Sequence, residues 1–312
     1  MGLRSTLAAF GIEPTRVRRV TVGRPAPLGN ENWHVWTRAG ERVVLRRHGY
    51  GRTAEEIEYE TRVLHHAAAA GWRVPVPLGA PVTDGDRFVS VCTYVPGTSH
   101  RIENAAQLRE RGALLACLHH DLRPLAPRIG QRPGWHPMHD LETSLQALRW
   151  EDGVAVLGQQ RPDLARPLRA GTEFVERQLD AVSARALPVS VIHGDFTRWN
   201  VRFRGGRLTG VLDFDLTHLD TRAADLAMAR AARSPELLDA YRAESARLGW
   251  PLDPDEERVL PGLDGALMIG IVAWELYGQL VAGVMDIELV ERQVRKLRTA
   301  TLGGAPRKGK DR

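Results

Sequence analysis

Residues 191–215 of the chain read VIHGDFTRWNVRFRGGRLTGVLDFD, and they combine short apolar runs with one histidine, one asparagine and three aspartates. The overlapping run VSVIHGD (189–195) predicts a strand that ends in a polar loop. Residues 200–204 and 207–215 predict the two strands of a hairpin, because the dipeptide Gly205-Gly206 suits the positive φ angles of a tight turn.

This hairpin would gather polar side chains at one end. Asn200 and Asp213 would approach each other from opposite strands, and Asp195 lies in the loop just before them. Such oxygen-bearing side chains suit a hard divalent cation. Mg²⁺ usually takes only one or two ligands from a protein, and water and substrate phosphates supply the rest. The stretch therefore predicts a site for Mg²⁺ and substrate phosphates.

The run H-G-D-x-x-x-x-N, followed by L-D-F, resembles the catalytic and metal-binding loops of the aminoglycoside phosphotransferase and choline kinase superfamily of small-molecule kinases. The resemblance implies an α+β, two-lobed fold like that of protein kinases. The N-terminal lobe would have a small antiparallel sheet with one helix, and the larger C-terminal lobe would be mainly helical. It also implies ATP and Mg²⁺ as cofactors, with Asp195 as the catalytic base, Asn200 and Asp213 as magnesium ligands, and His193 as the residue that braces the loop.

The chain before this stretch is consistent with an N-terminal lobe at residues 1–95. Residues 16–48 alternate between apolar and polar side chains in three short segments, which predicts an antiparallel meander. Residues 53–71 predict a helix with Thr53 as N-cap, Glu56 as its capping-box partner and Gly71 as C-cap. A second pair of strands is expected over residues 76–82 and 87–95.

The pattern becomes helical from Ala105 onwards, first in AAQLRERGALLACLHHDL and then over most of residues 140–182 and 223–300. We therefore expect a C-terminal catalytic and acceptor-binding lobe over residues 96–302. Residues 303–312, GGAPRKGKDR, are expected to form a disordered tail. The resemblance covers about residues 20–230, so the helical remainder stays without an assigned role.

The resemblance also requires a basic residue on the third strand to hold the ATP phosphates. Arg46 has this place, and the first lysine of the chain comes only at position 296. Val44 would share its strand face and lie against the adenine. Glu60, an acid on an otherwise apolar helix face, is the expected partner of Arg46. The alternative is that both side chains point to solvent, with Arg47 or Glu56 equally suitable.

Two further segments are candidates for nucleotide contacts. In PLGNENWHVW (27–36), backbone N–H groups at Gly29, Asn30 and Asn32 would cover phosphates, although an ordinary hairpin turn explains the segment equally well. The segment VSVCTYVPG (89–97) resembles the connection between the lobes in this superfamily, where the backbone near Thr93 and Val95 would bind adenine.

The acceptor is expected to be a small molecule with a hydroxyl group. An aminoglycoside-like or other aminocyclitol antibiotic would favour an acidic pocket, whereas an anionic acceptor would use Arg198 and Arg222. The alternatives are a metabolite kinase of the homoserine or choline kinase type and a catalytically silent pseudokinase, against which the intact Asp195, Asn200 and Asp213 argue. The other candidate acceptor contacts are Trp199, Asp215, Asp220, Trp274 and Glu275.

Composition and charge predict a soluble protein. The net charge of +5 is spread along the chain and interleaved with acids, so it predicts a solvated basic surface and no nucleic-acid partner. The two cysteines lack CxxC spacing, and no apolar run near the N-terminus resembles a signal peptide, so a cytoplasmic location is expected. The apolar stretch around residues 266–284 is interrupted by Trp274-Glu275 and Gln279, which argues against a membrane span.

Overall fold

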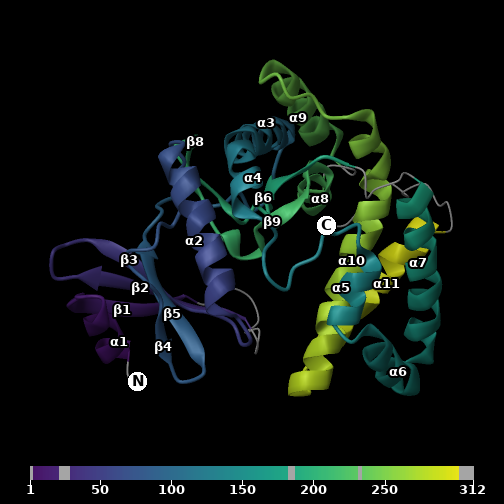
Figure 1. Cartoon of the computed structure of the whole chain (residues 1–312), viewed down its shortest axis with the longest axis horizontal. Helices are drawn as coiled ribbons and strands as arrows, with labels where there is room; N and C mark the ends of the chain where they lie inside the picture. Colours follow the sequence, from purple (N-terminus) through teal and green to yellow (C-terminus); the bar gives the residue numbers. More distant parts are fainter. Residues whose placement is uncertain (1–2, 21–28, 182–186, 231–233, 302–312) are drawn as a thin grey trace.

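The computed structural model describes residues 3–20, 29–181, 187–230 and 234–301, and it has two lobes (Figure 1). The N-terminal lobe contains a five-stranded sheet in the order β1-β2-β3-β5-β4, in which all neighbouring strands are antiparallel. Its elements are α1 (Leu3–Ala9), β1 (Pro14–Val20), β2 (Glu31–Thr37), β3 (Arg42–Arg47), α2 (Ala54–Ala69), β4 (Val82–Asp84) and β5 (Arg87–Thr93).

Alternation along β3 gives the sheet two different faces. Val43 and Leu45 are buried in an apolar cluster with Leu7 of α1, whereas Val44 and Arg46 lie on the opposite face. The predicted meander is confirmed. So is the capping box of α2, since Thr53 and Glu56 bond each other's backbone N–H groups, although Gly71 lies one residue beyond the helix cap, with φ +96°.

Two features of the N-terminal lobe differ from the prediction. Helix α1 was not expected. The strand expected over residues 76–82 is shorter, because only its last residue, Val82, belongs to β4, and the part before it makes a single bridge from Pro77 to Cys92. Pro75 and Pro77 cannot donate hydrogen bonds to a ladder, which explains why no continuous strand forms there.

The C-terminal lobe is mainly helical and has two small two-stranded sheets, β6-β9 and β7-β8. The predicted helix over residues 105–122 and the hairpin around Gly205-Gly206 are confirmed, with φ angles of +58° and +73° at these glycines. Its elements are α3 (Ala105–Leu122), η1 (Arg123–Leu125), α4 (Ala126–Ile129), α5 (Leu141–Ala147), α6 (Trp150–Gln160), α7 (Pro162–Ala181), β6 (Val189–Ile192), β7 (Val201–Arg204), β8 (Arg207–Val211), η3 (Phe214–Leu216), β9 (His218–Thr221), α8 (Arg222–Met228), α9 (Pro235–Arg247), α10 (Pro254–Ala282) and α11 (Ile287–Thr301).

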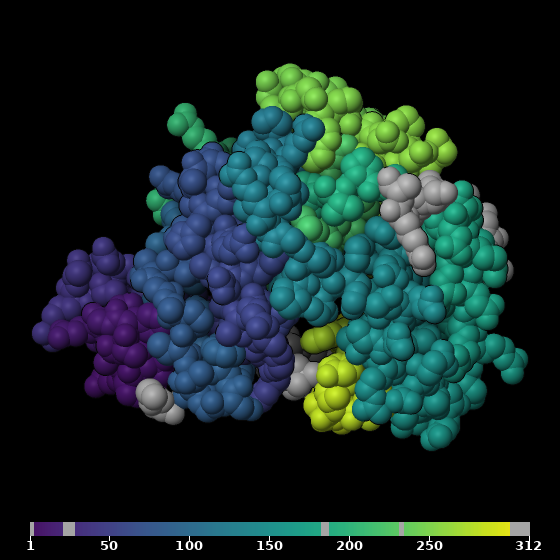
Figure 2. Space-filling model, viewed as in Figure 1, coloured from purple at the N-terminus to yellow at the C-terminus, as the bar shows by residue number. Residues whose placement is uncertain are grey.

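Helix α10 is the long central helix of the C-terminal lobe and packs against α6, α7, α8 and α11 (Figure 1). It is long and apolar enough to cross a membrane, but 67% of its most apolar window is buried inside the protein, as in the core helix of a globular lobe. In the space-filling view, the blue surface of α2 continues into the teal surface of the C-terminal lobe (Figure 2). The tail expected over residues 303–312 lies outside the described residues.

Candidate active site

The loop after β6 carries the first group of predicted site residues. Asn200 donates from Nδ2 to the Asp195 carboxylate at 2.8 Å and to the Asp195 carbonyl at 2.9 Å. Gly194 has φ +81°, and a Cβ atom there would lie 2.2 Å from the Leu216 carbonyl, so only glycine fits. The loop therefore packs directly on the segment that contains Asp213.

His193 connects these two segments. Its Nδ1 accepts from the Asp195 backbone N–H at 3.1 Å, and its Nε2 donates to the Leu212 carbonyl at 2.9 Å. Burial lowers the pKa of His193, so the imidazole is neutral and has one donor and one acceptor, as these contacts require. This is the bracing geometry that the sequence predicted.

Asp225 of α8 bonds the backbone of the same loop. Its carboxylate accepts from the backbone N–H groups of His193 at 2.7 Å and Gly194 at 2.8 Å, and from Nε2 of His119 at 3.0 Å. Burial alone would raise the pKa of Asp225, but the hydrogen bonds from His119 and the His193 N–H lower it. Asp225 therefore remains ionised and fixes the backbone that precedes Asp195.

Arg46 of β3 in the N-terminal lobe contacts Asp213 of the C-terminal lobe. Its guanidinium bonds Oε1 of Glu60 at 3.1 Å, Oδ1 of Asp213 at 3.3 Å and Oδ1 of Asn32 at 3.4 Å. Burial alone would lower the pKa of Arg46, but Glu60 and Asp213 raise it, so the residue stays charged. The predicted pair of Arg46 and Glu60 is present.

The alternative residues face elsewhere. Arg47 bonds Glu31 and Asp84, on the other face of the sheet from Arg46. Glu56 accepts from Nε1 of Trp135 at 2.9 Å, in the C-terminal lobe. Arg47 and Glu56 are therefore excluded as the pair that reaches Asp213.

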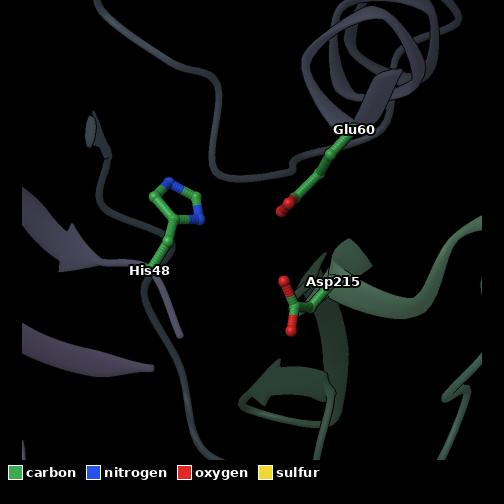
Figure 3. A group of neighbouring side chains, drawn as sticks. All are labelled: His48, Glu60 and Asp215. Atoms are coloured by element: carbon green, nitrogen blue, oxygen red, sulfur yellow. The ribbon is translucent and has the colours of Figure 1, made fainter. Parts of the chain in front are cut away.

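His48, Glu60 and Asp215 point toward one another, with ligand atoms within 4.8 Å (Figure 3). Arg52 lies 3.1 Å from Oε2 of Glu60 and 3.1 Å from Oδ1 of Asp215, and Arg46 holds the other Glu60 oxygen. Burial and the two arginines lower the pKa of His48 to about 3. Because guanidinium groups already neutralise the two carboxylates, we interpret this cluster as an ion-pair network and not as a cation site.

Asp195 is ionised less readily than an ordinary aspartate. Burial and the nearby Asp213 carboxylate together raise its pKa to about 7, against the opposing effect of the hydrogen bond from Asn200. A carboxylate with a pKa near neutrality is suited to accept a proton in the middle of the pH range.

The remaining residues predicted to bind the nucleotide make different contacts. Val44 pairs with His34 and Cys92 on the face that carries Arg46. Asn30 bonds the Gly49 N–H through Oδ1 and Asp215 through Nδ2, so it connects the lobes. Residues 21–28 lie outside the described residues, so the start of the predicted phosphate-covering turn is not described.

The structure narrows one backbone prediction. The Thr93 N–H donates to the Val76 carbonyl at 2.9 Å, so this N–H is not available to a nucleotide base. The Gly29 carbonyl is bonded by Arg87 at 2.9 Å, and the contact predicted for the Gly29 N–H stays a prediction. Val95 is buried and packs against Gly210 of β8. A Cβ atom added to Gly210 would lie only 2.4 Å from Cγ1 of Val95. The Val95 side chain therefore connects the segment between the lobes to the β7-β8 hairpin.

Most of the acidic residues predicted to contact an acceptor have structural partners instead. Asp220 has no exposed surface, and it accepts from the backbone N–H groups of Met138 and Thr221 at 2.6 and 2.7 Å. Its pKa is lowered to about 2 because hydrogen bonds from His139 and His218 outweigh the effect of burial. The assignment of Asp220 to an acceptor pocket is therefore wrong.

Two other acceptor predictions have different outcomes. Glu275 is partly exposed and accepts from the Asp286 N–H at 2.7 Å through one of its two oxygens, so its contact with an acceptor stays a prediction. Arg222 is buried and paired with Glu256, so it is not available to an anionic acceptor.

Three residues predicted to contact the acceptor are partly exposed. Trp199 and Trp274 are 53% and 49% exposed. The guanidinium of Arg198 lies over the Trp199 ring, 4.6 Å from its centroid. Arg198 and Trp199 belong to the loop of Asp195, whereas the structure shows no contact that brings Trp274 to this loop.

Arg52 and Arg132 were not predicted from the sequence, although both contact the segment after Asp213. Arg52 donates to the Asp215 carbonyl at 3.0 Å and Arg132 donates to the same carbonyl at 2.6 Å. Each is a single arginine in a loop without helical or strand periodicity. No spacing signal in the sequence distinguishes them from surface arginines.

The chain is similar in sequence to several bacterial homoserine kinases. It is 29% identical to the homoserine kinase of Sinorhizobium medicae, over 56% of this chain and 52% of the relative. It is 26% identical to that of Chelativorans sp., over 85% of this chain and 81% of the relative. The chain spans between 52% and 59% of the length of the first three curated relatives that it matches.

Solved structures share the fold at low sequence identity. Aminoglycoside phosphotransferase APH(4)-Ia in complex with ADP and hygromycin B has a TM-score of 0.66 at 15% identity, and the match covers 98% of this chain and 99% of that chain. A microcompartment-associated aminopropanol kinase has a TM-score of 0.63 at 18% identity, with 95% and 94% covered. These likenesses confirm the expected two-lobed fold.

A sequence model described as "Phosphotransferase enzyme family" matches residues 22–260, which is more than half of the chain. The chain therefore belongs to the phosphotransferase enzyme family.

Proposed function

We propose that the protein is a kinase that transfers the γ-phosphoryl group of ATP to a hydroxyl group of a small molecule. One observation carries this proposal. One edge of the C-terminal lobe carries Asp195, Asn200 and Asp213. Arg46 of the other lobe, which Glu60 holds in place, bonds Asp213. Similar structures that contain ADP support a nucleotide bound between these residues.

The residues at this edge fit a magnesium ion. Nδ2 of Asn200 is used by Asp195, so its Oδ1 is the atom left for a metal, and Asp213 contributes a carboxylate whose side chain is 44% exposed. Such an oxygen donor set is the one that Mg²⁺ prefers. Held by Asn200 and Asp213, Mg²⁺ would offset the negative charge of the phosphates.

The protein's own residues supply positioning and proton acceptance. Asp195, fixed by Asn200 and by its backbone bond to His193, would orient the acceptor hydroxyl and take its proton. Arg46 would exchange part of its contact with Asp213 for the α and β phosphates, while Glu60 keeps its guanidinium in place. In phosphoryl transfer, positioning and electrostatics supply most of the rate.

For the acceptor, we favour a small hydroxy amino acid or amino alcohol of the homoserine type. The sequence relatives named homoserine kinase support this class. The aminoglycoside-like acceptor expected from the sequence needs free carboxylates for a polycation. Asp215, Asp220 and Glu275 all have partners within the protein, and this weakens that alternative.

An acceptor screen tests the proposed function. ADP formation would be measured with Mg·ATP and a panel of homoserine, other amino alcohols, choline, aminoglycosides and nucleosides. We expect turnover that depends on homoserine or an amino alcohol. Turnover with aminoglycosides alone would restore the antibiotic class. Tight Mg·ATP binding without turnover on any compound would instead support the pseudokinase.

Arg46→Ala and Glu60→Ala are each expected to raise the KM for ATP on the order of tenfold and to leave the acceptor KM nearly unchanged. The reason is that both residues form one unit, so the double variant should be much less than additive. Steady-state kinetics with both substrates varied would measure this. Arg47→Ala is the matched control, because that arginine lies on the other side of the sheet.

Arg46→Lys should recover only part of the ATP affinity. A lysine carries the charge but lacks the planar fork that bonds Glu60, Asp213 and Asn32 together. Additive effects of the two alanine changes, or a larger ATP defect in Arg47→Ala, would show that another residue holds the phosphates.

A further inference from the structure

The connection between α4 and α5 places a buried arginine beneath the segment that follows Asp213. The side chain of Arg132 has no exposed surface. Its Nη1 donates to the carbonyl of Asp215 at 2.6 Å and to the carbonyl of Thr217 at 3.0 Å. The ring of Trp135 covers the guanidinium, 4.3 Å from Cζ to the ring centroid. A residue outside every sequence motif therefore determines the path of this backbone.

The same connection also contacts helix α2 of the other lobe. Nε1 of Trp135 donates to Oε1 of Glu56 at 2.9 Å, and Nη2 of Arg132 lies 3.5 Å from that oxygen. The other oxygen of Glu56 accepts from the Thr53 N–H at 2.9 Å in the capping box. Glu60 follows one turn later on the same helix face. Because a helical turn is stiff, the contacts to Glu56 also set the position of Glu60.

Two arginine side chains bond the carbonyl of Asp215. Arg52 donates to it at 3.0 Å in addition to Arg132. Burial lowers the pKa of Arg132 to about 10, and the charge of Arg52 lowers it as well. A buried cation beside a second one is unfavourable unless its hydrogen bonds compensate. The arrangement is therefore stable only while Arg132 keeps its carbonyl and carboxylate partners.

Asp213 requires such support. It has φ +62°, a left-handed conformation that is uncommon for residues other than glycine and persists only when neighbouring contacts hold it. The bonds from Arg52 and Arg132 fix the chain two residues later. Without them, the backbone at Asp213 is free to relax, and its carboxylate would move away from Arg46.

We propose that Arg132 is a positioning residue for the nucleotide and Mg²⁺ site. It couples α2 to residues 213–217, so that Glu60 and Asp213 keep Arg46 between them although Arg132 contacts none of these three side chains. This inference rests on the proposed function, in which Arg46 and Asp213 bind Mg·ATP. Arg132, a residue of the C-terminal lobe, would thus control the affinity for the nucleotide and have no effect on the affinity for the acceptor.

Arg132→Lys tests the coupling, because a lysine keeps the charge but cannot bond two carbonyls and Glu56 with one fork. Calorimetric titration with Mg·ADP is expected to show binding weakened on the order of tenfold, as for loss of a residue that supports a metal ligand. The KM for ATP should rise similarly and the acceptor KM stay nearly constant. Trp135→Phe, which keeps the ring and removes the donor to Glu56, should give a smaller shift in the same direction.

Arg128→Lys is the matched control, since Arg128 lies in the same part of the chain and is exposed. Hydrogen exchange of the ligand-free protein provides an independent readout, and we expect faster exchange in both α2 and residues 213–217 of Arg132→Lys. Should that variant fail to fold, Trp135→Phe is measured in the same way.

Unchanged Mg·ADP affinity in a folded Arg132→Lys protein would overturn the inference, even if its melting temperature falls. If the unmodified protein binds no Mg·ADP, the proposed function fails. In that case, hydrogen exchange of Arg132→Lys still tests the coupling. Faster exchange confined to residues 213–217 would overturn it, whereas faster exchange in both α2 and residues 213–217 would support it.

Discussion

Asp195→Asn is expected to fold normally, to bind Mg·ATP and to lose turnover by a factor on the order of 10² or more. Asparagine keeps the shape of the side chain, and its Oδ1 still accepts from Nδ2 of Asn200, a bond of 2.8 Å in the unmodified protein. The carboxylate that would take the acceptor proton is lost, however. Turnover with the identified acceptor and calorimetric binding of Mg·ATP would together measure the effect.

Asp152→Asn is the control for this variant, because Asp152 lies on α6 and pairs with Arg149 at the surface. It should leave turnover and nucleotide affinity unchanged. Asp195→Asn with full turnover would end the assignment of Asp195 as the base. A parallel loss of Mg·ATP binding would show that Asp195 acts on the nucleotide and not on the acceptor hydroxyl.

The parts of the site that were predicted correctly depend on local features of the sequence. The capping box of Thr53 and Glu56 and the turn at Gly205-Gly206 each involve residues within three positions of one another. The hairpin then places Asn200 near Asp213 because strand pairing fixes its register. For Arg46 and Glu60, the family resemblance called for a basic residue on the third strand and a carboxylate on the next helix. The face of the strand and the face of the helix, which are local properties, then selected these two residues.

The predictions that failed concern charged residues in contacts between distant parts of the chain. Asp220 and Arg222 have the same residue types as surface groups, but the fold buries both, the first against the Met138 N–H and the second against Glu256. Buried charges need partners, and these partners come from segments more than 30 positions away. Periodicity carries no information on such pairs.

The contact between the lobes differs from one built with lysine, because arginine supplies the cations described in it. Arg46 bonds the carboxylates of Glu60 and Asp213 with separate nitrogens. Nη2 of Arg52 lies 3.1 Å from Oε2 of Glu60 and 3.1 Å from Oδ1 of Asp215, and so joins these two carboxylates. Guanidinium forks fix geometry better than ammonium groups do. The two lobes are therefore connected by directional bonds through Glu60 of α2.

Asp213→Ala is expected to weaken Mg·ADP binding by on the order of 100-fold, the upper end of the range for losing a residue that supports a bound metal. The carboxylate would act on the nucleotide through Mg²⁺, so binding measured in EDTA should change little. Isothermal titration with and without EDTA separates these two cases.

A second variant is needed because Asp213 has φ +62°, a conformation that alanine adopts only with strain. Asp213→Asn avoids this strain, since asparagine tolerates the left-handed region and its Oδ1 still accepts from Arg46, which bonds Asp213 at 3.3 Å in the unmodified protein. It removes only the negative charge. We therefore expect Asp213→Asn to reproduce most of the Mg²⁺-dependent loss at an unchanged melting temperature. Two results together would contradict this assignment: an equal loss of affinity in the alanine variant with and without EDTA, and normal Mg·ADP binding by the asparagine variant. Asp213 would then have a structural role, and other residues would have to hold the metal.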